Sequence, residues 1–399
     1  MILIALLVLM SPSLARGRNL TDIFRNELAN LELEPVGDAL AKTVASAYPV
    51  ASASSSVTYV YNSATDTFDR QTHVLGPIFG ERAETIGERQ IDLSLNYSYV
   101  QFTSINGQDL GHLENAPEIN LRVVSFPIVD AHGNPSSVVL ADGRTTTFLP
   151  LQVHADLGVE AQILSPSFTY GVTPNLDVNL TIPLLRTFLR AQATSQVPDP
   201  RLPQFALKEG DPNQQTLTKS GRESAVGAGD LLLRAKYAFH RGEPVDIAAG
   251  LGLSLPSGNP DNLMGSGTTR VQPTLILSRV FLDRIEPLLN LGFDLNCNDV
   301  GSSIFRWAAG ATAQVVGPLT GAVVFLGRNE LGAQTDPIEA PFFLQIERND
   351  IYDFSIGFRY LIRDALVVAA NVLVPLNDDG LRADAIPTLQ VEYAFGAPW

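Results

Sequence analysis

The last strand-like segment of the chain, residues 388–395, alternates polar and apolar residues and ends close to the C-terminus. One face carries Leu389, Val391, Tyr393 and Phe395, and the other carries Thr388, Gln390, Glu392 and Ala394. A strand of this kind is typical of the closing strand of an outer-membrane β-barrel, whose outer face meets lipid and whose inner face meets a lumen. A single alternating segment also fits an edge strand of a soluble sandwich, so recurrence of the pattern decides between the two.

The same alternation with period two recurs upstream, between turn signals made of Gly, Pro, Asn and Asp. It predicts an all-β fold, a transmembrane antiparallel β-barrel of about 12 strands (10–14). The strands are predicted at residues 90–104, 150–171, 175–194, 226–240, 244–256, 268–281, 284–297, 302–316, 319–332, 350–362, 364–376 and 384–395.

The connections between these strands separate by length. One set of alternate links is tight, whereas the other set contains the long stretches 105–149, 195–225 and 333–349. Outer-membrane barrels have short periplasmic turns and long external loops. A soluble sandwich has no reason to sort its loops in this way, so the loop lengths favour the barrel and the outer membrane of a Gram-negative bacterium.

Composition excludes several other classes of protein. The chain is 45% hydrophobic, yet after the extreme N-terminus no run approaches the ~18 apolar residues of a spanning helix. The net charge of -15, with four lysines and 23 arginines, gives no electrostatic footprint for nucleic acid. Cys297 is the single cysteine, and no Cys/His spacing resembles a zinc site. We therefore expect no metal, no cofactor and no nucleic-acid partner.

The N-terminal part differs in character from the rest. Residues 1–15 read as a signal peptide, because an apolar stretch is followed by Ser13 and Ala15 at the positions that a signal peptidase reads. No Lys or Arg precedes the apolar stretch, so retention as an anchor stays open. Residues 16–89 are predicted to form a periplasmic lead-in or a plug, and residues 90–399 the barrel.

The faces of the predicted strands separate large aliphatic residues from small and polar ones, and we expect the polar face to line the lumen. Acidic residues outnumber basic ones among the candidates, which predicts a mild preference against anions if a pore is open. Pairing of Asp230 with Arg234, or of Asp353 with Arg359, would instead make a structural network. The lumen-lining candidates are Asp92, Asn96, Gln152, His154, Asp156, Glu160, Asp177, Asn179, Asp230, Arg234, Lys236, Asp246, Asp294, Arg306, Asp353, Arg359 and Glu392.

A hydrolytic site finds little support among these residues. A nucleophilic serine needs a base within hydrogen-bond reach and a third group that orients the base. Of the five histidines only His154 is predicted to lie inward in the middle of a strand, with Asp156 on the same face and no serine beside them. We therefore predict that the protein is not an enzyme and has no catalytic residues.

Several glycine-containing segments at fixed spacing carry a family resemblance. They are Gly-Ala-Gly-Asp-Leu at 227–231, Gly-Leu-Gly at 250–252, Leu-Pro-Ser-Gly at 255–258 and Gly-Ser-Gly-Thr at 265–268. Together with residues 170–184 and 79–87, they resemble an outer-membrane family named after the meta-pathway of phenol degradation.

The resemblance implies a barrel that moves small, hydrophobic or aromatic compounds across the outer membrane, and it brings no binding residues with it. A non-conducting structural or interaction barrel is the alternative. The expected partners are outer-membrane lipid, a small-molecule solute, and the barrel-assembly machinery through the C-terminal strand that ends at Phe395.

Overall fold

A computed structural model gives the fold. The predicted signal peptide lies outside the described residues. The structure describes residues 19–27, 40, 43–44, 47–53, 59–62, 67–70, 74–113, 119–120, 124–127, 138–139, 145–146, 148–196, 216–332, 343–344, 350–362 and 365–396.

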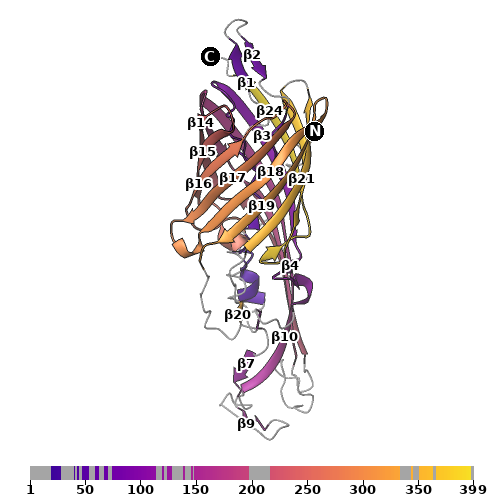
Figure 1. Cartoon of the computed structure of the whole chain (residues 1–399). Coiled ribbons are helices and arrows are strands. Elements are labelled where there is room, and N and C mark those ends of the chain that lie inside the picture. Colours follow the sequence, from indigo (N-terminus) through magenta and orange to yellow (C-terminus); the bar gives the residue numbers. More distant parts are fainter. Residues whose placement is uncertain are drawn as a thin grey trace.

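The strands close into an antiparallel barrel (Figure 1). The first barrel strand, β3 (Gln90–Phe102), pairs with the last, β24 (Ile386–Gly396), and the hydroxyls of Ser98 and Thr388 lie 2.8 Å apart across this junction. The predicted all-β, 12-stranded barrel is therefore confirmed. The other ten strands of the ring are β10 (Phe148–Thr173), β11 (Leu176–Thr181), β14 (Leu231–His240), β15 (Asp246–Leu255), β16 (Arg270–Ser278), β17 (Ile285–Asn296), β18 (Ile304–Val316), β19 (Leu319–Glu330), β21 (Asp350–Ile362) and β22 (Leu366–Pro375).

The outer wall of the barrel is an apolar band. Strand β17 shows the pattern, because its residues alternate strictly between exposed and buried. Leu291 and Phe293 are exposed on the outside, while Asn290 and Asp294 are buried on the inside. Exposed apolar side chains on one face of every strand are what a bilayer covers.

Tight turns and long connections lie at opposite ends. The C-terminal end of β24 and the hairpin of β1 (Tyr59–Asn62) and β2 (Thr67–Arg70) are at the end with the tight turns (Figure 1). We call this end periplasmic and the opposite end external, because short turns are periplasmic in such barrels.

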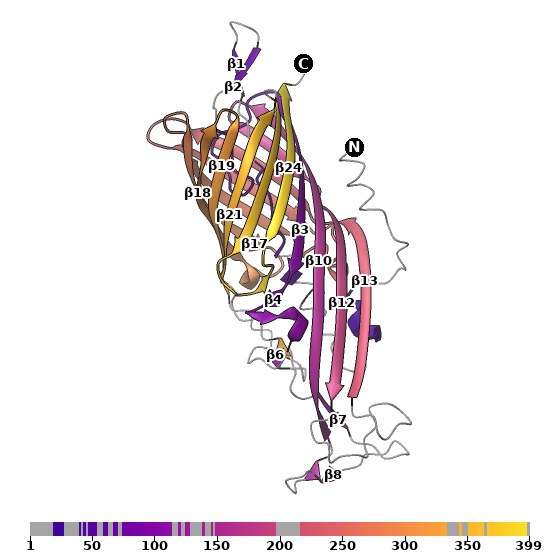
Figure 2. The same cartoon turned by 90° about the vertical axis from the view of Figure 1, so that its right-hand side faces the viewer.

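Three strands extend beyond the barrel at the external end (Figure 2). They are the outer half of β10, together with β12 (Leu184–Gln196) and β13 (Thr216–Ala228). The sequence predicted a single strand over 175–194, but the structure divides it into β11 and β12 beside Pro183. Proline has no N–H for the strand ladder. The predicted loop 195–225 is also shorter than expected, because its last part is β13.

The inward face of the outer half of β10 was predicted wrongly. Val159 pairs with Phe102, and both are buried on the inside of the sheet. His154, Asp156 and Glu160 alternate with such residues and therefore lie on the outer face. The physical reason is that this part of the strand projects beyond the apolar band, where the outer face meets water and the inner face packs against the N-terminal segment.

Short elements complete the described fold. Among the described residues, no helix has the length and apolar character needed to cross a bilayer. The short strands are β4 (Ser104–Ile105) with β5 (Gln108–Asp109) and β23 (Leu381–Arg382), β6 (Ile119–Asn120) with β20 (Phe343–Leu344), β7 (Val124–Pro127) with β10, and β8 (Val138–Val139) with β9 (Thr145–Thr146). The helical turns are η1 (Ile23–Glu27), η3 (Leu110–His112), η4 (Pro260–Asn262) and η5 (Val300–Ser302).

Candidate functional site in the barrel lumen

Residues 74–87 run along the periplasmic half of the lumen and are bonded to the wall. The backbone N–H of Ala83 donates to Ser278 Oγ at 2.9 Å, and that of Ile86 donates to Asp177 Oδ2 at 3.0 Å. Lys236 Nζ donates to the carbonyl of Glu84 at 2.6 Å. The inward polar side chains of the strands therefore form hydrogen bonds with backbone N–H and C=O groups of residues 74–87, a segment that is not part of a β-sheet.

The strongest anchor of this segment is Arg82. Its side chain is 0% exposed and reaches Glu286 Oε2 at 3.0 Å and Glu84 Oε2 at 2.7 Å. Glu286 is 1% exposed and also accepts from Ser278 Oγ at 2.9 Å. A buried carboxylate needs such partners, because an isolated buried charge is costly.

A second N-terminal stretch, residues 47–53, lies deeper in the lumen. Arg234 Nη1 donates to the carbonyl of Ala51 at 2.9 Å, and the N–H of Ala53 donates to Glu81 Oε1 at 2.7 Å. Tyr48 donates its hydroxyl to the carbonyl of Leu263 at 2.8 Å. Burial raises the pKa of Tyr48, so this hydroxyl stays protonated as a donor.

At the external end, the connection between β15 and β16 folds inward over the lumen and is fastened by Asp230. Asp230 Oδ1 accepts from the N–H of Gly258 at 3.1 Å, and Oδ2 accepts from the N–H and the hydroxyl of Ser266 at 2.7 and 2.8 Å. A Cβ on Gly265 would collide with Asp230 Oδ1. Three of the glycine-containing segments, at 227–231, 255–258 and 265–268, therefore meet around Asp230 in what we call the clasp, whereas Gly250 and Gly252 lie elsewhere, on β15.

The clasped loop carries apolar side chains to the N-terminal residues 19–24. Leu263 and Met264 are buried in the same core cluster as Leu20 and Phe24. The N–H of Thr21 donates to the carbonyl of Asp261 at 3.1 Å. The loop and the start of the described chain thus cover each other at the external end.

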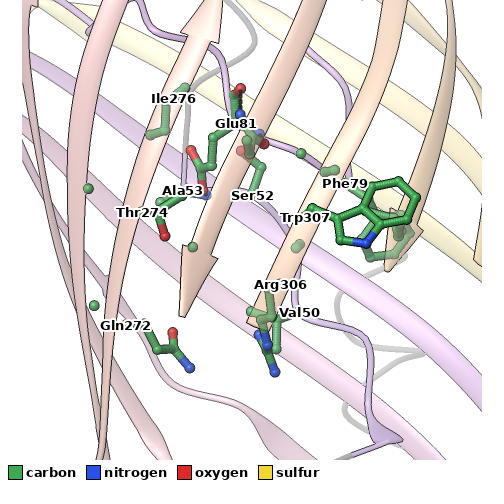
Figure 3. Close-up of a pocket in the computed structure, with 18 of the residues that line it drawn as sticks. Val50, Ser52, Ala53, Phe79, Glu81, Gln272, Thr274, Ile276, Arg306 and Trp307 are labelled. Carbon is green, nitrogen blue, oxygen red and sulfur yellow. Dashed lines mark hydrogen bonds between the residues drawn. The ribbon is translucent and has the colours of Figure 1, made fainter. Parts of the chain in front are cut away.

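A cavity of about 240 Å³ remains between residues 47–53, the Phe79–Glu81 stretch and the wall. Gln272 and Arg306 lie together at one end of this cavity, and Ile276 and Glu81 lie at the other end (Figure 3). A second cavity of about 140 Å³ shares Arg234, Gln272 and Arg306 with it. We call the larger one the lumenal cavity.

The structure places most of the predicted lumen-lining residues on the inner face. Asp246 accepts from the N–H of Gly242 at 2.7 Å beside a periplasmic turn, and Asp230 lies in the clasp between β13 and β14. The side chain of Gln152 lies outside the described residues. The residues found on the inner face of the strands are Asp92, Asn96, Asp177, Asn179, Arg234, Lys236, Asp246, Asp294, Arg306, Asp353, Arg359 and Glu392.

The predicted ion pairs have different partners in the structure. Arg234 lies 3.7 Å from Glu81, and not beside Asp230. Asp353 pairs with Arg382, while Arg359 Nη1 lies 3.5 Å from Glu392 Oε2. These partners come from distant segments, so neighbours along one strand could not reveal them.

Outside residues 74–87, four charged lumen residues of the described chain were missed from the sequence: Arg270, Glu286, Arg328 and Arg382. Glu286 shares the inner face of β17 with Asn290 and Asp294. Following the alternation from Asn290 four residues toward the N-terminus would therefore have identified it. Arg270 is the first residue of β16, and Arg328 lies two residues before the end of β19. Extending the alternation to the ends of these strands would have identified both. Arg382 lies on a short strand outside the barrel ring, where no alternation marks it.

The architecture defines the class of protein. A closed antiparallel barrel with an exposed apolar outer band and a polar interior is the form in which strands cross an outer membrane. The chain is therefore an outer-membrane β-barrel of a Gram-negative bacterium.

Residues 136–380 match the model of the family described as "Putative MetA-pathway of phenol degradation". The match spans more than half of the chain, and the chain belongs to this family. It includes the clasp around Asp230, whereas residues 79–87 lie before it. No curated protein matches the sequence.

Solved structures of similar shape are outer-membrane proteins of low identity. An outer membrane channel from Pseudomonas putida F1 is 12% identical, with 80% of this chain and 100% of that chain covered and a TM-score of 0.46. The toluene transporter TbuX of Ralstonia pickettii is 11% identical, with 77% and 90% covered and a TM-score of 0.36. The TodX monoaromatic hydrocarbon channel, as a deltaS2 mutant, is 10% identical, with 79% and 93% covered and a TM-score of 0.38. Similarity at this level does not transfer a solute from one barrel to another.

Proposed function

We propose that the barrel is a passive channel for small molecules, with hydrophobic or aromatic compounds as the preferred solutes. The lumenal cavity of about 240 Å³ carries this proposal. Protein interiors are close-packed and leave few voids larger than a water molecule. A cavity of ~150 Å³ already holds benzene, so the lumenal cavity has room for one aromatic ring with a substituent.

The N-terminal residues 47–53 and 74–87 are proposed to act as the plug of this channel. Their bonds to Arg234, Lys236 and Glu286 support the proposal, because they hold the segment against the wall instead of leaving it in the periplasm. Solutes would then pass between the plug and the wall, through the cavity. The family name points to phenol as the first aromatic solute to test.

Filling the cavity from the wall is expected to reduce conductance. Gly250 lines the cavity, and a Cβ there would lie 3.5 Å from Ile276 Cδ1, which is an ordinary contact. The ring in Gly250→Trp would therefore project into the lumen of a folded barrel and lower the single-channel conductance in a planar bilayer several-fold. Phenol in the bath should also reduce the ion current of the unaltered protein.

The matched control is Ala249→Trp, which places the same ring on the exposed outer face of the same strand. It should leave conductance unchanged. Folding of both variants is checked by heat-modifiable migration. A folded, unaltered barrel that shows no conductance steps and no response to phenol would support the alternative, a non-conducting structural barrel.

A further inference from the structure

The charged side chains that line the lumenal cavity already have partners. Arg306 Nη2 pairs with Asp294 at 2.9 Å, and Arg234 Nη1 lies 3.7 Å from Glu81. The remaining charged residues of the described lining also interact: Lys236, Arg328 and Asp353. A charged ligand would have to displace these partners, because an unpaired charge inside the barrel is costly. The lining therefore favours an uncharged ligand.

The neutral polar groups of the lining differ from one another in how they are bonded. Asn290 uses both ends of its amide on the backbone of Glu81, with distances of 2.6 and 2.8 Å. Thr274 of β16 is the contrast. Among the described residues, none donates a hydrogen bond to its hydroxyl or accepts one from it, although Thr274 lines the cavity and is only partly buried. This hydroxyl is open to a ligand.

Thr274 stands between two glycines on the inner face of the wall. Gly250 of β15 and Gly292 of β17 are its register partners on either side. Three neighbouring strands thus carry a single side chain at this level. A Cβ on Gly292 would lie 2.7 Å from Thr274 Oγ1, so the glycine leaves the room that the hydroxyl needs.

Gln272 is the next inward residue of the same strand, because side chains two residues apart share a face. Its side chain forms a hydrogen bond with Asp294. A carboxylate only accepts, so the Gln272 amide nitrogen is the donor and its carbonyl oxygen is left as an acceptor. Figure 3 shows both Gln272 and Thr274 in the wall of the cavity. An acceptor beside a hydroxyl favours a ligand that brings its own O–H group.

The inward residue on the other side of Thr274 is apolar. It is Ile276, and Phe79 and Leu326 also line the cavity. Along the inner face of β16 the wall therefore changes from hydrogen-bonding groups to hydrocarbon. This order fits a molecule with a ring at one end and a hydroxyl group at the other.

We propose that Thr274 and Gln272 form a hydroxyl-binding site that determines the specificity of the lumenal cavity, and that its solutes are uncharged ring compounds with a hydroxyl group. This rests on the proposed channel function and specifies its solute. A site built to hydrogen-bond a hydroxyl group discriminates against the analogue that lacks it, because the polar groups of the site are then left unpaired.

The test compares phenol with toluene, two rings of similar size. Binding to the folded barrel in detergent is measured by titration calorimetry at neutral pH, where phenol is uncharged. Toluene gains more from leaving water, so the readout is the ratio of the two affinities in each protein. Thr274→Val removes the hydroxyl and should weaken phenol binding about fivefold without weakening toluene binding. Thr274→Ser keeps a hydroxyl and should preserve the ratio.

The matched control is Thr312→Val on β18. Thr312 is also buried on the inner face with an unpartnered hydroxyl, but it lies outside the described lining of the cavity. This variant should change neither affinity. If Thr274→Val does not fold, Gln272→Met replaces it with the same expectation.

An unchanged ratio of affinities in folded Thr274→Val, or no binding of phenol to the unaltered protein, would overturn the hydroxyl site. Conductance steps in the same preparation would then still support the channel. Phenol binding that depends on Thr274 in a barrel without conductance would refute the channel while keeping the site.

Discussion

Replacing Arg82 with alanine is expected to lower the free energy of unfolding of the barrel by about 3 kcal/mol, because breaking a buried ion pair leaves its partner uncompensated. The carboxylate left behind is that of Glu286, which is 1% exposed. The same change removes the main anchor of residues 74–87. We therefore also expect a several-fold increase in single-channel conductance. Unfolding in urea and planar-bilayer recordings measure the two effects.

A surface ion pair at the same end of the barrel is the matched control. Arg279 Nη2 lies 3.7 Å from Glu243 Oε1, and Glu243 is 90% exposed. Exposed pairs contribute less than about 1 kcal/mol, so Arg279→Ala should have little effect. Adding Glu286→Gln to Arg82→Ala should restore part of the lost stability by removing the orphaned charge. Unchanged stability and conductance in Arg82→Ala would show that the segment is not held through this pair.

Replacing Asp230 with alanine is expected to destabilise the external end of the barrel. Three hydrogen bonds to Gly258 and Ser266 are lost, and two backbone N–H groups lose their acceptor. At roughly 1 kcal/mol for each bond, the free energy of unfolding should fall by about 3 kcal/mol. The loop that carries Leu263 and Met264 over the lumen should then move, which current recordings would show as added noise and larger open events.

The comparison for this prediction is Asp299→Ala in the connection between β17 and β18. Asp299 caps a helical turn by accepting one bond, from the N–H of Gly301 at 3.0 Å. Loss of such a cap costs about 1 kcal/mol. None of the residues in the helical turn that Asp299 caps is buried, so no apolar side chain of this turn packs into the lumen. If Asp230→Ala behaves like Asp299→Ala, then the clasp does not hold the loop.

The barrel itself could be predicted from the sequence, because each strand that spans the membrane has one face in contact with lipid and the other face toward the lumen. Alternation therefore revealed the strands and, within the apolar band, the inward residues such as Asp177, Asp294 and Glu392. The rule failed for Asp156 and Glu160, because it holds only where the outer face touches lipid. Beyond the bilayer the outer face of a strand meets water and can be polar, while the inner face can be apolar, as it is at Leu157 and Val159.

Local pattern thus determined the fold class, the strand positions within the band and the end at which each loop lies. The tertiary structure alone decided which charges meet. Arg82 and Glu286 are 204 residues apart in the chain, and Asp230 acts on two glycine-containing segments from a later loop. The lining of the lumenal cavity was likewise decided there, since it combines residues from several strands of the barrel with residues 47–53 and 79–81, which share no strand alternation with them.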